Sequence, residues 1–290
     1  MSRFAWVLNL DAEFELARPN FAYVQRRRLG EQLAAHGHAA QQLLGPHDVL
    51  VQGASTLPGE FVGRAWCPTP GALRQLRAAG VEPEAHPEAA VLRRVNHRLF
   101  AHELGGGLAG QAYFRDLSAL KELLKRAERP RLLKRPLAFA GRGQMRFYGP
   151  ISRQQWSWLE SSLLDDGLIV EPLVTPTLEL SVHGFVWRDG RFELGRVCVQ
   201  QVTDRGVFRE LRLALPGELE PDEQGQLMHS ANTVAERLHE ANYFGPFGID
   251  AYRYQSPEQN GFCALSEINA RYTMGFVTGF PRHPSLVSPL

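Results

Sequence analysis

The sequence predicts a mixed α/β and α+β protein, and three features of the chain carry this prediction. Apolar runs alternate with helical patterns over roughly the first 80 residues, which is typical of a parallel sheet covered by helices. Strand patterns dominate after residue 168. Near the end, two runs with strand character, Phe247–Tyr254 and Phe262–Ala270, flank the turn-forming cluster 256–261. This arrangement predicts an antiparallel hairpin.

The composition is that of an ordinary globular protein. The chain has 290 residues, 44% hydrophobic and 22% charged, and a formal net charge of +1. This charge gives no indication of a nucleic-acid partner, and no apolar run is long enough for a membrane span. The three cysteines are far apart and form no CxxC pair, so we expect neither a zinc site nor a disulfide framework. We infer a reducing, cytoplasmic location.

The first third of the chain reads as a small α/β unit. Its elements are expected strands at Phe4–Leu10, Asp48–Gln52 and Phe61–Cys67, and expected helices at Tyr23–His36 and Pro70–Ala79. The alternation predicts a parallel sheet. No GxGxxG follows the first strand, which argues against a dinucleotide-binding fingerprint.

The rest of the chain supplies both helices and strands. Helical patterns are expected at Glu88–Leu104, Asp116–Glu128, Ser152–Asp165 and Pro221–Ala241, and strands at 131–136, 168–173, Leu178–Trp187, Phe192–Thr203 and Val207–Leu215.

Lysine is rare in this chain, which draws attention to Lys134. Among 32 basic residues only three are lysines, and Lys121 and Lys125 have the spacing of an exposed helix face. Lys134 lies on an expected strand that leads into the glycine-rich turn 140–144. Such a turn can surround phosphate oxygens with backbone N–H groups. It is not a P-loop, because the lysine precedes the glycines and no GK[ST] follows.

The expected hairpin gathers polar side chains on one face. A turn centred between residues 258 and 259 places Asp250 opposite Glu267, and Asn269 and Arg271 share that face if the strand continues. Crowded carboxylates favour a cation between them, and a few hard oxygen ligands suit Mg²⁺. The alternative is a solvated strand face with ordinary surface charge.

Taken in order, these pieces resemble the ATP-grasp superfamily. The resemblance is carried by the lysine strand and glycine turn (LLKRPLAFAGRGQ), by Val170-Glu171-Pro172, and by the strand and turn ELSVHGFVWRDG. FGIDAY and the closing Glu267-Ile268-Asn269-Ala270-Arg271 continue it, and the last is similar to the family's E-x-N-x-R. It implies an ATP-grasp fold with an amino-terminal α/β domain at 1–87, a small subdomain at 88–167 and a large subdomain at 168–290.

The resemblance also implies roles. ATP would be bound with Mg²⁺, or with Mn²⁺ in its place. Lys134 would contact the phosphates, which Gly141 and Gly143 would cover, while Glu171 and the backbone of Leu173 would bind the adenine and Glu179 the ribose. The metal would be held by Asp250, Glu267 and Asn269, and Arg271 would contact the transferring phosphoryl group. For Glu171 and Glu179 the alternative is an ordinary strand carboxylate. The family's other lysine is absent, and either Arg98 or His97 takes its place.

The function implied is ATP-dependent ligation of a carboxylate to an amine through an acyl phosphate. A kinase-type use of the same site and a nucleotide-binding partner protein without turnover are the alternatives. The substrates implied are small-molecule or peptide carboxylates and amines, with no nucleic-acid or membrane partner. A homodimer is one assembly compatible with the sequence.

Overall fold

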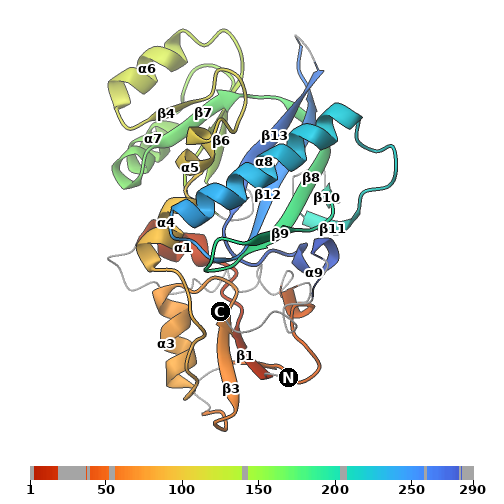
Figure 1. Ribbon diagram of the computed structural model, residues 1–290. Coiled ribbons are helices and arrows are strands. Elements are labelled where there is room, and N and C mark those ends of the chain that lie inside the picture. The colour runs from red at the N-terminus through yellow and green to blue at the C-terminus, as the bar shows by residue number, and fades with distance from the viewer. Residues whose placement is uncertain are drawn as a thin grey trace.

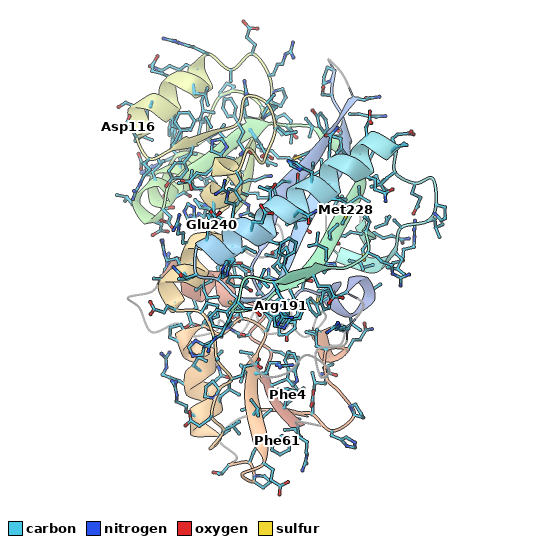
Figure 2. The ribbon with its side chains drawn as sticks, in the orientation of Figure 1. Phe4, Phe61, Asp116, Arg191, Met228 and Glu240 are labelled. Carbon is cyan, nitrogen blue, oxygen red and sulfur yellow. The ribbon has the colours of Figure 1, made fainter. Side chains whose placement is uncertain are left out.

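The residues that the structure describes form three sheets. The computed structural model describes residues 3–18, 37, 40–51, 56–138, 143–202, 208–257, 260–280 and 282. Figure 1 shows a three-stranded sheet beside α3 at one end, a four-stranded sheet with α6 and α7 at the other, and a larger sheet crossed by α8. In Figure 2, Phe4 and Phe61 mark the first of these regions, Asp116 the second and Met228 the helix over the third.

The first sheet is parallel, as predicted. Its order is β2-β1-β3, with bounds β1 Arg3–Val7, β2 Val49–Leu50 and β3 Phe61–Ala65. The helix α3, Pro70–Ala78, begins at Thr69, whose hydroxyl accepts a hydrogen bond from the Ala72 N–H, and its apolar residues pack on this sheet. A short helix that the sequence analysis did not predict, α1 (Ala12–Ala17), follows β1. The predicted helix Tyr23–His36 lies outside the described residues.

The second sheet is antiparallel and has the order β4-β7-β5-β6. Its elements are β4 (Ala112–Phe114), β5 (Arg131–Lys134), β6 (Gln144–Phe147), β7 (Leu168–Pro172) and the helices α6 (Leu117–Lys125) and α7 (Arg153–Asp165). Leu120, Leu133, Leu159 and Val170 lie in one buried cluster, so the helices cover one face of this sheet. Lys134 and Leu133 alternate along β5, so Lys134 points to the face opposite these helices.

The third sheet has the path β11-β10-β8-β12-β13, with β9 paired to β8. Its elements are β8 (Thr175–Val186), β9 (Phe192–Leu194), β10 (Cys198–Val202), β11 (Phe208–Leu213), β12 (Gly245–Gln255) and β13 (Asn260–Asn269). The helix α8, Pro221–Glu240, lies across β8, β12 and β13 (Figure 1), and its apolar residues share a core with Leu180, Val182 and Ile249. The residues that alternate with these point away from α8.

Two predicted elements are wrong in their continuity. The expected helix Glu88–Leu104 is two helices, α4 (Ala89–Asn96) and α5 (Arg98–Glu103), because His97 has extended backbone and its ring accepts a hydrogen bond from the Leu99 N–H. The expected strand Phe192–Thr203 is broken into β9 and β10. The short helix α9, Phe276–Gly279, follows β13. Among the described residues, no helix combines the length and apolar character needed to cross a membrane.

Candidate functional site

The polar face of the large sheet carries the two carboxylates that the hairpin predicts. Asp250 on β12 lies directly opposite Glu267 on β13, which confirms the predicted pairing. Two side-chain amides donate to Asp250, Gln200 to Oδ1 and Asn269 to Oδ2, each at 2.9 Å. Burial, followed by the negative charge of Glu267, raises the pKa of Asp250 to about 7. The protein thus holds two carboxylates at a separation that disfavours ionisation of both.

The pairing of Asp250 with Glu267 depends on an irregularity that the sequence does not reveal. At the outer end of the hairpin Gln255 lies opposite Asn260, a register that centres the turn one residue earlier than expected. A register shift between Asp250 and Tyr252 then corrects the offset, since Tyr252 pairs with Cys263 but Asp250 with Glu267. Such bulges often re-aim side chains beside functional sites.

The chemistry of this carboxylate pair fits a divalent cation. Hard cations such as Mg²⁺ take oxygen ligands and usually keep water and phosphate oxygens in their coordination shell. Among the described residues, no group of three or more His, Cys, Asp or Glu side chains is arranged to hold a metal ion. Asp250 and Glu267 would therefore hold an ion whose other ligands come from elsewhere. Asn269 is oriented differently from the prediction, because its amide nitrogen faces Asp250 and its oxygen accepts from Arg271 at 2.9 Å. Its oxygen could bind a metal only after the amide turned.

Arg98, not His97, reaches the carboxylates. The Nη2 atom of Arg98 lies 2.8 Å from both carboxylate oxygens of Glu267, and Nη1 donates to the Arg135 carbonyl at 2.7 Å. His97 caps α5 and its Nε2 faces Asp166 at 3.7 Å. Burial lowers the pKa of His97 to about 4, so its ring is neutral near pH 7. Of the two alternatives, the structure brings only Arg98 to the predicted metal strand.

Lys134 forms an ion pair within the small sheet. Its Nζ lies 2.5 Å from Glu171 Oε1, and both side chains are largely buried. In the register of β5, β6 and β7, Glu171, Leu132 and Arg146 form one row across the sheet, so Arg146 shares the face of Glu171. The N–H of Leu173 donates to the Pro130 carbonyl. A hydrogen bond from Leu173 to an adenine ring would therefore use its carbonyl oxygen or replace that bond.

The face of the small sheet that carries Lys134 and Glu171 lies near the polar face of the large sheet. The negative charge of Glu171 contributes to the raised pKa values of Tyr252 and Cys263, although burial is the largest cause for both. Tyr252 pairs with Glu179 across β12 and β8, so these side chains share one face with Glu171 near them. Burial also raises the pKa of Glu179. Glu171 of the small sheet, with its partner Lys134, thus lies near Tyr252 on the face of the large sheet that also carries Asp250 and Glu267.

The glycine-rich turn is described only in part. Gly141 lies outside the described residues. Gly143 has φ +72°, a conformation that favours glycine, and its carbonyl accepts a hydrogen bond from the Arg135 N–H. A Cβ at Gly143 would lie 2.9 Å from the Cβ of Ala138. Gly143 therefore packs closely against the end of the strand that carries Lys134.

Arg271 lies beyond the end of β13 and is buried against the first sheet. Its guanidinium forms an ion pair with Glu13 on α1, and Nη1 donates to the Tyr272 carbonyl. Because Nη2 also donates to Asn269, Arg271 lies beside the metal strand, as predicted, but it is committed to protein acceptors in this structure. The expected role on a phosphoryl group stays a prediction.

His183 is buried on the same sheet face as the carboxylates, opposite Gly248, which is two residues before Asp250 on β12. Hydroxyl oxygens contact both ring nitrogens, Ser181 Oγ at 3.1 Å from Nε2 and Thr273 Oγ1 at 2.9 Å from Nδ1. Burial lowers the pKa of His183 to about 4. The ring is therefore a neutral structural group that joins the segment after β13 to β8.

The buried neutral His183 predicts acid sensitivity. The unfolded chain binds a proton at His183 below about pH 6.5 whereas the native state resists it, so stability falls as the pH drops from about 6.5 to 4, by up to about 3 kcal/mol. In His183→Gln this loss should disappear. Urea unfolding at pH 4.5 and 7.5 measures it, with His229→Gln on the exposed face of α8 as control. Equal pH dependence in His183→Gln and wild type would contradict the assignment.

Three residues of the site escaped the sequence analysis. Gln200, Tyr252 and Glu13 are brought to the site by sheet register or by packing between the first and third sheets. Gln200 could have been found only by pairing β10 with β8, which places it opposite Glu179. Nothing in the local sequence around Glu13 points to Arg271.

Comparison with known proteins identifies the fold. No family model matches the chain, and no curated protein matches it. Among solved structures, D-alanyl-alanine synthetase A from Vibrio cholerae is 14% identical with a TM-score of 0.57, over 98% of this chain and 94% of that one. N5-carboxyaminoimidazole synthetase from Staphylococcus aureus, complexed with ADP, is 9% identical with a TM-score of 0.56, over 94% and 71%. The corresponding Thermus thermophilus synthetase is 20% identical with a TM-score of 0.53, over 93% and 72%. The predicted fold class is thus confirmed, and the chain has the ATP-grasp fold.

Proposed function

We propose that the protein is an ATP-dependent ligase that joins a carboxylate to an amine. The observation that carries this proposal is the proximity of two polar sheet faces, one with the Lys134–Glu171 pair and the other with the Asp250–Glu267 pair. The Lys134 ammonium on one sheet and the polar face of the other sheet suit a nucleoside triphosphate, whose phosphates need positive charge and whose base needs hydrogen bonds. The neighbours with the same fold include enzymes whose names describe synthetases, one of them complexed with ADP.

The residues take roles that follow from their positions. Lys134 would move from Glu171 to the phosphates, leaving Glu171 to accept from the adenine amino group. Glu179, on the same face as Tyr252, would accept from the ribose hydroxyls. Asp250 and Glu267 would hold Mg²⁺, or Mn²⁺, which when bound neutralises charge on the phosphate oxygens. Asn269 would join them after its amide turns, and Gly141 and Gly143 would cover the phosphates with backbone N–H groups.

The proposed reaction has two steps. A substrate carboxylate oxygen attacks the γ-phosphorus of ATP, and the bond from that phosphorus to the bridging oxygen breaks, giving an acyl phosphate and ADP. An amine then attacks the acyl carbon, phosphate leaves, and the amine loses a proton. Positioning and fixed charge supply most of the rate enhancement in such reactions. The small sheet, with α6 and α7, would exclude water from the acyl phosphate.

A product assay tests the ligase and separates it from a kinase. ADP release that requires both an acid and an amine, with an amide and free phosphate as products, is expected. A phosphorylated acceptor would indicate kinase chemistry instead. Candidate acids and amines include free amino acids and short peptides, in line with small-molecule or peptide substrates.

A nucleotide-binding protein without turnover is the second candidate. The observation that favours it is the neutralisation of both arginines near the carboxylates by protein acids, Arg98 by Glu267 and Arg271 by Glu13. Tight Mg²⁺-dependent ATP binding, with no ADP release across a broad screen of acids, amines and hydroxyl acceptors, would support it over the ligase.

Lys134→Met tests the nucleotide site without knowledge of the substrate. Loss of the ammonium should weaken ATP binding roughly tenfold or more, with and without Mg²⁺, because a charge-assisted phosphate contact is lost. Isothermal titration calorimetry with a non-hydrolysable ATP analogue measures the affinity. Lys125→Met is the matched control, since Lys125 is exposed on α6, which packs on the sheet that carries Lys134. Unchanged affinity in Lys134→Met would contradict the placement of the phosphates.

A further inference from the structure

The side chain of Arg98 is fixed in place before any ligand binds. It is 8% exposed, and its Nη1 donates to the Arg135 carbonyl at 2.7 Å. The backbone N–H of Arg98 donates to the next carbonyl, that of Pro136, at 3.1 Å. Arg135 is itself held to α7, because its guanidinium donates to the hydroxyls of Ser162 and Ser161. The guanidinium of Arg98 is therefore preorganised by hydrogen bonds of its own side chain and backbone to residues 135 and 136, and α7 in turn holds residue 135 in place.

The contact between Arg98 and Glu267 has the geometry of a chelated cation. Nη2 is equidistant, at 2.8 Å, from Oε1 and Oε2 of Glu267. An ion bound by both oxygens of a carboxylate occupies this same position between them. Because Arg98 lies between the two oxygens of Glu267, each oxygen can bind a metal ion only through the lone pair that points away from Arg98. The Glu267 side chain is 28% exposed, and Asp250 lies opposite it on the neighbouring strand.

We propose that the guanidinium of Arg98 occupies the position that a second metal ion would take on Glu267, which limits this site to one divalent ion held between Asp250 and Glu267. The inference rests on the proposed nucleotide site and adds a residue that determines how many metal ions this site binds. Arginine suits this role better than lysine, because its guanidinium keeps its charge at every physiological pH and holds a carboxylate in a fixed geometry. It also predicts that Arg98 weakens metal binding in the absence of nucleotide.

Electrostatics gives the sign of this effect. Arg98 carries a positive charge within hydrogen-bond distance of Glu267, so it repels a divalent ion held by the same carboxylate. Removing Arg98 leaves two carboxylates without a balancing cation. We therefore expect the neutral variants Arg98→Met and Arg98→Gln to bind Mn²⁺ at least tenfold more tightly than wild type when no nucleotide is present.

The first arm of the experiment measures Mn²⁺ binding without nucleotide, by electron paramagnetic resonance of the free ion. Arg94→Met is the matched control, because Arg94 is exposed on α4 and its loss removes the same formal charge. Arg98→Gln retains an amide donor for the Arg135 carbonyl and serves if Arg98→Met fails to fold. Tighter binding in either neutral Arg98 variant, and not in Arg94→Met, supports the inference.

The second arm counts bound Mn²⁺ in the presence of a saturating non-hydrolysable ATP analogue. Wild type is expected to bind one ion per chain in the nucleotide complex, and the neutral Arg98 variants two. Two ions in wild type would overturn the inference, as would Mn²⁺ affinities of the Arg98 variants that match Arg94→Met in the first arm. If no variant binds the analogue while the first arm shows the expected shift, the nucleotide proposal fails and the role of Arg98 stands.

Discussion

Glu267→Gln is expected to weaken binding of Mg²⁺–ATP about 100-fold while leaving metal-free ATP binding within a few-fold of wild type. Glutamine keeps the shape of the side chain but supplies no charge to a divalent ion, and second-sphere changes alone at metal sites cost 10- to 100-fold in affinity. The Arg98 guanidinium would also face a neutral amide in place of the carboxylate that it now contacts at 2.8 Å. Calorimetry with a non-hydrolysable ATP analogue, with and without Mg²⁺, measures both affinities.

A surface glutamate provides the control for this prediction. Glu236 is exposed on α8, on the far side of the sheet from the carboxylate pair, so Glu236→Gln should bind Mg²⁺–ATP as wild type does. An equal loss of affinity with and without Mg²⁺ in Glu267→Gln would show that Glu267 stabilises the nucleotide site but does not bind the metal ion.

Breaking the ion pair between Arg271 and Glu13 is expected to cost about 3–5 kcal/mol of unfolding free energy, because either single substitution leaves a buried charge without its partner. Both side chains are at least nine-tenths buried, and the pair joins α1 to the segment that follows β13. The variants are Arg271→Met and Glu13→Gln, and urea denaturation measures the loss.

The double variant separates the ion pair from other contacts of these side chains. Arg271→Met combined with Glu13→Gln should lose less stability than the two single losses added together, since no unpaired charge remains. The exposed pair Arg237–Glu240 on α8 is the comparison, and Glu240→Gln should cost less than about 1 kcal/mol. Additive losses in the buried double variant would contradict a direct coupling between Arg271 and Glu13.

Sequence alone could predict those parts of the fold that depend on local pattern. The helix α3 begins and ends within one residue of its predicted bounds, because Thr69 caps it, Pro70 opens it and Gly80 follows its end. The parallel pairing of β1 with β3 follows from the alternation of strands and helices. His97 breaks the expected helix Glu88–Leu104, because its ring caps the next helix and the N–H of Arg98 donates to the distant carbonyl of Pro136. Helical spacing alone does not encode this long-range hydrogen bond.

The site shows the same division between local and long-range information. Asp250 faces Glu267 as predicted, yet the agreement needed a register shift in β13 to offset a turn placed one residue too late. The contacts of Arg98 with Glu267 and of Arg271 with Glu13 join residues 169 and 258 positions apart. Residue chemistry could nominate these side chains, but only the packing of three sheets determines which of them meet.

The most direct test of the proposed site is a crystal structure with a non-hydrolysable ATP analogue and Mn²⁺, recorded with anomalous scattering from manganese. One manganese peak is expected, bound by carboxylate oxygens of Asp250 and Glu267, beside phosphates that Lys134 contacts. A nucleotide bound away from Lys134, or manganese held without either carboxylate, would contradict the proposed site.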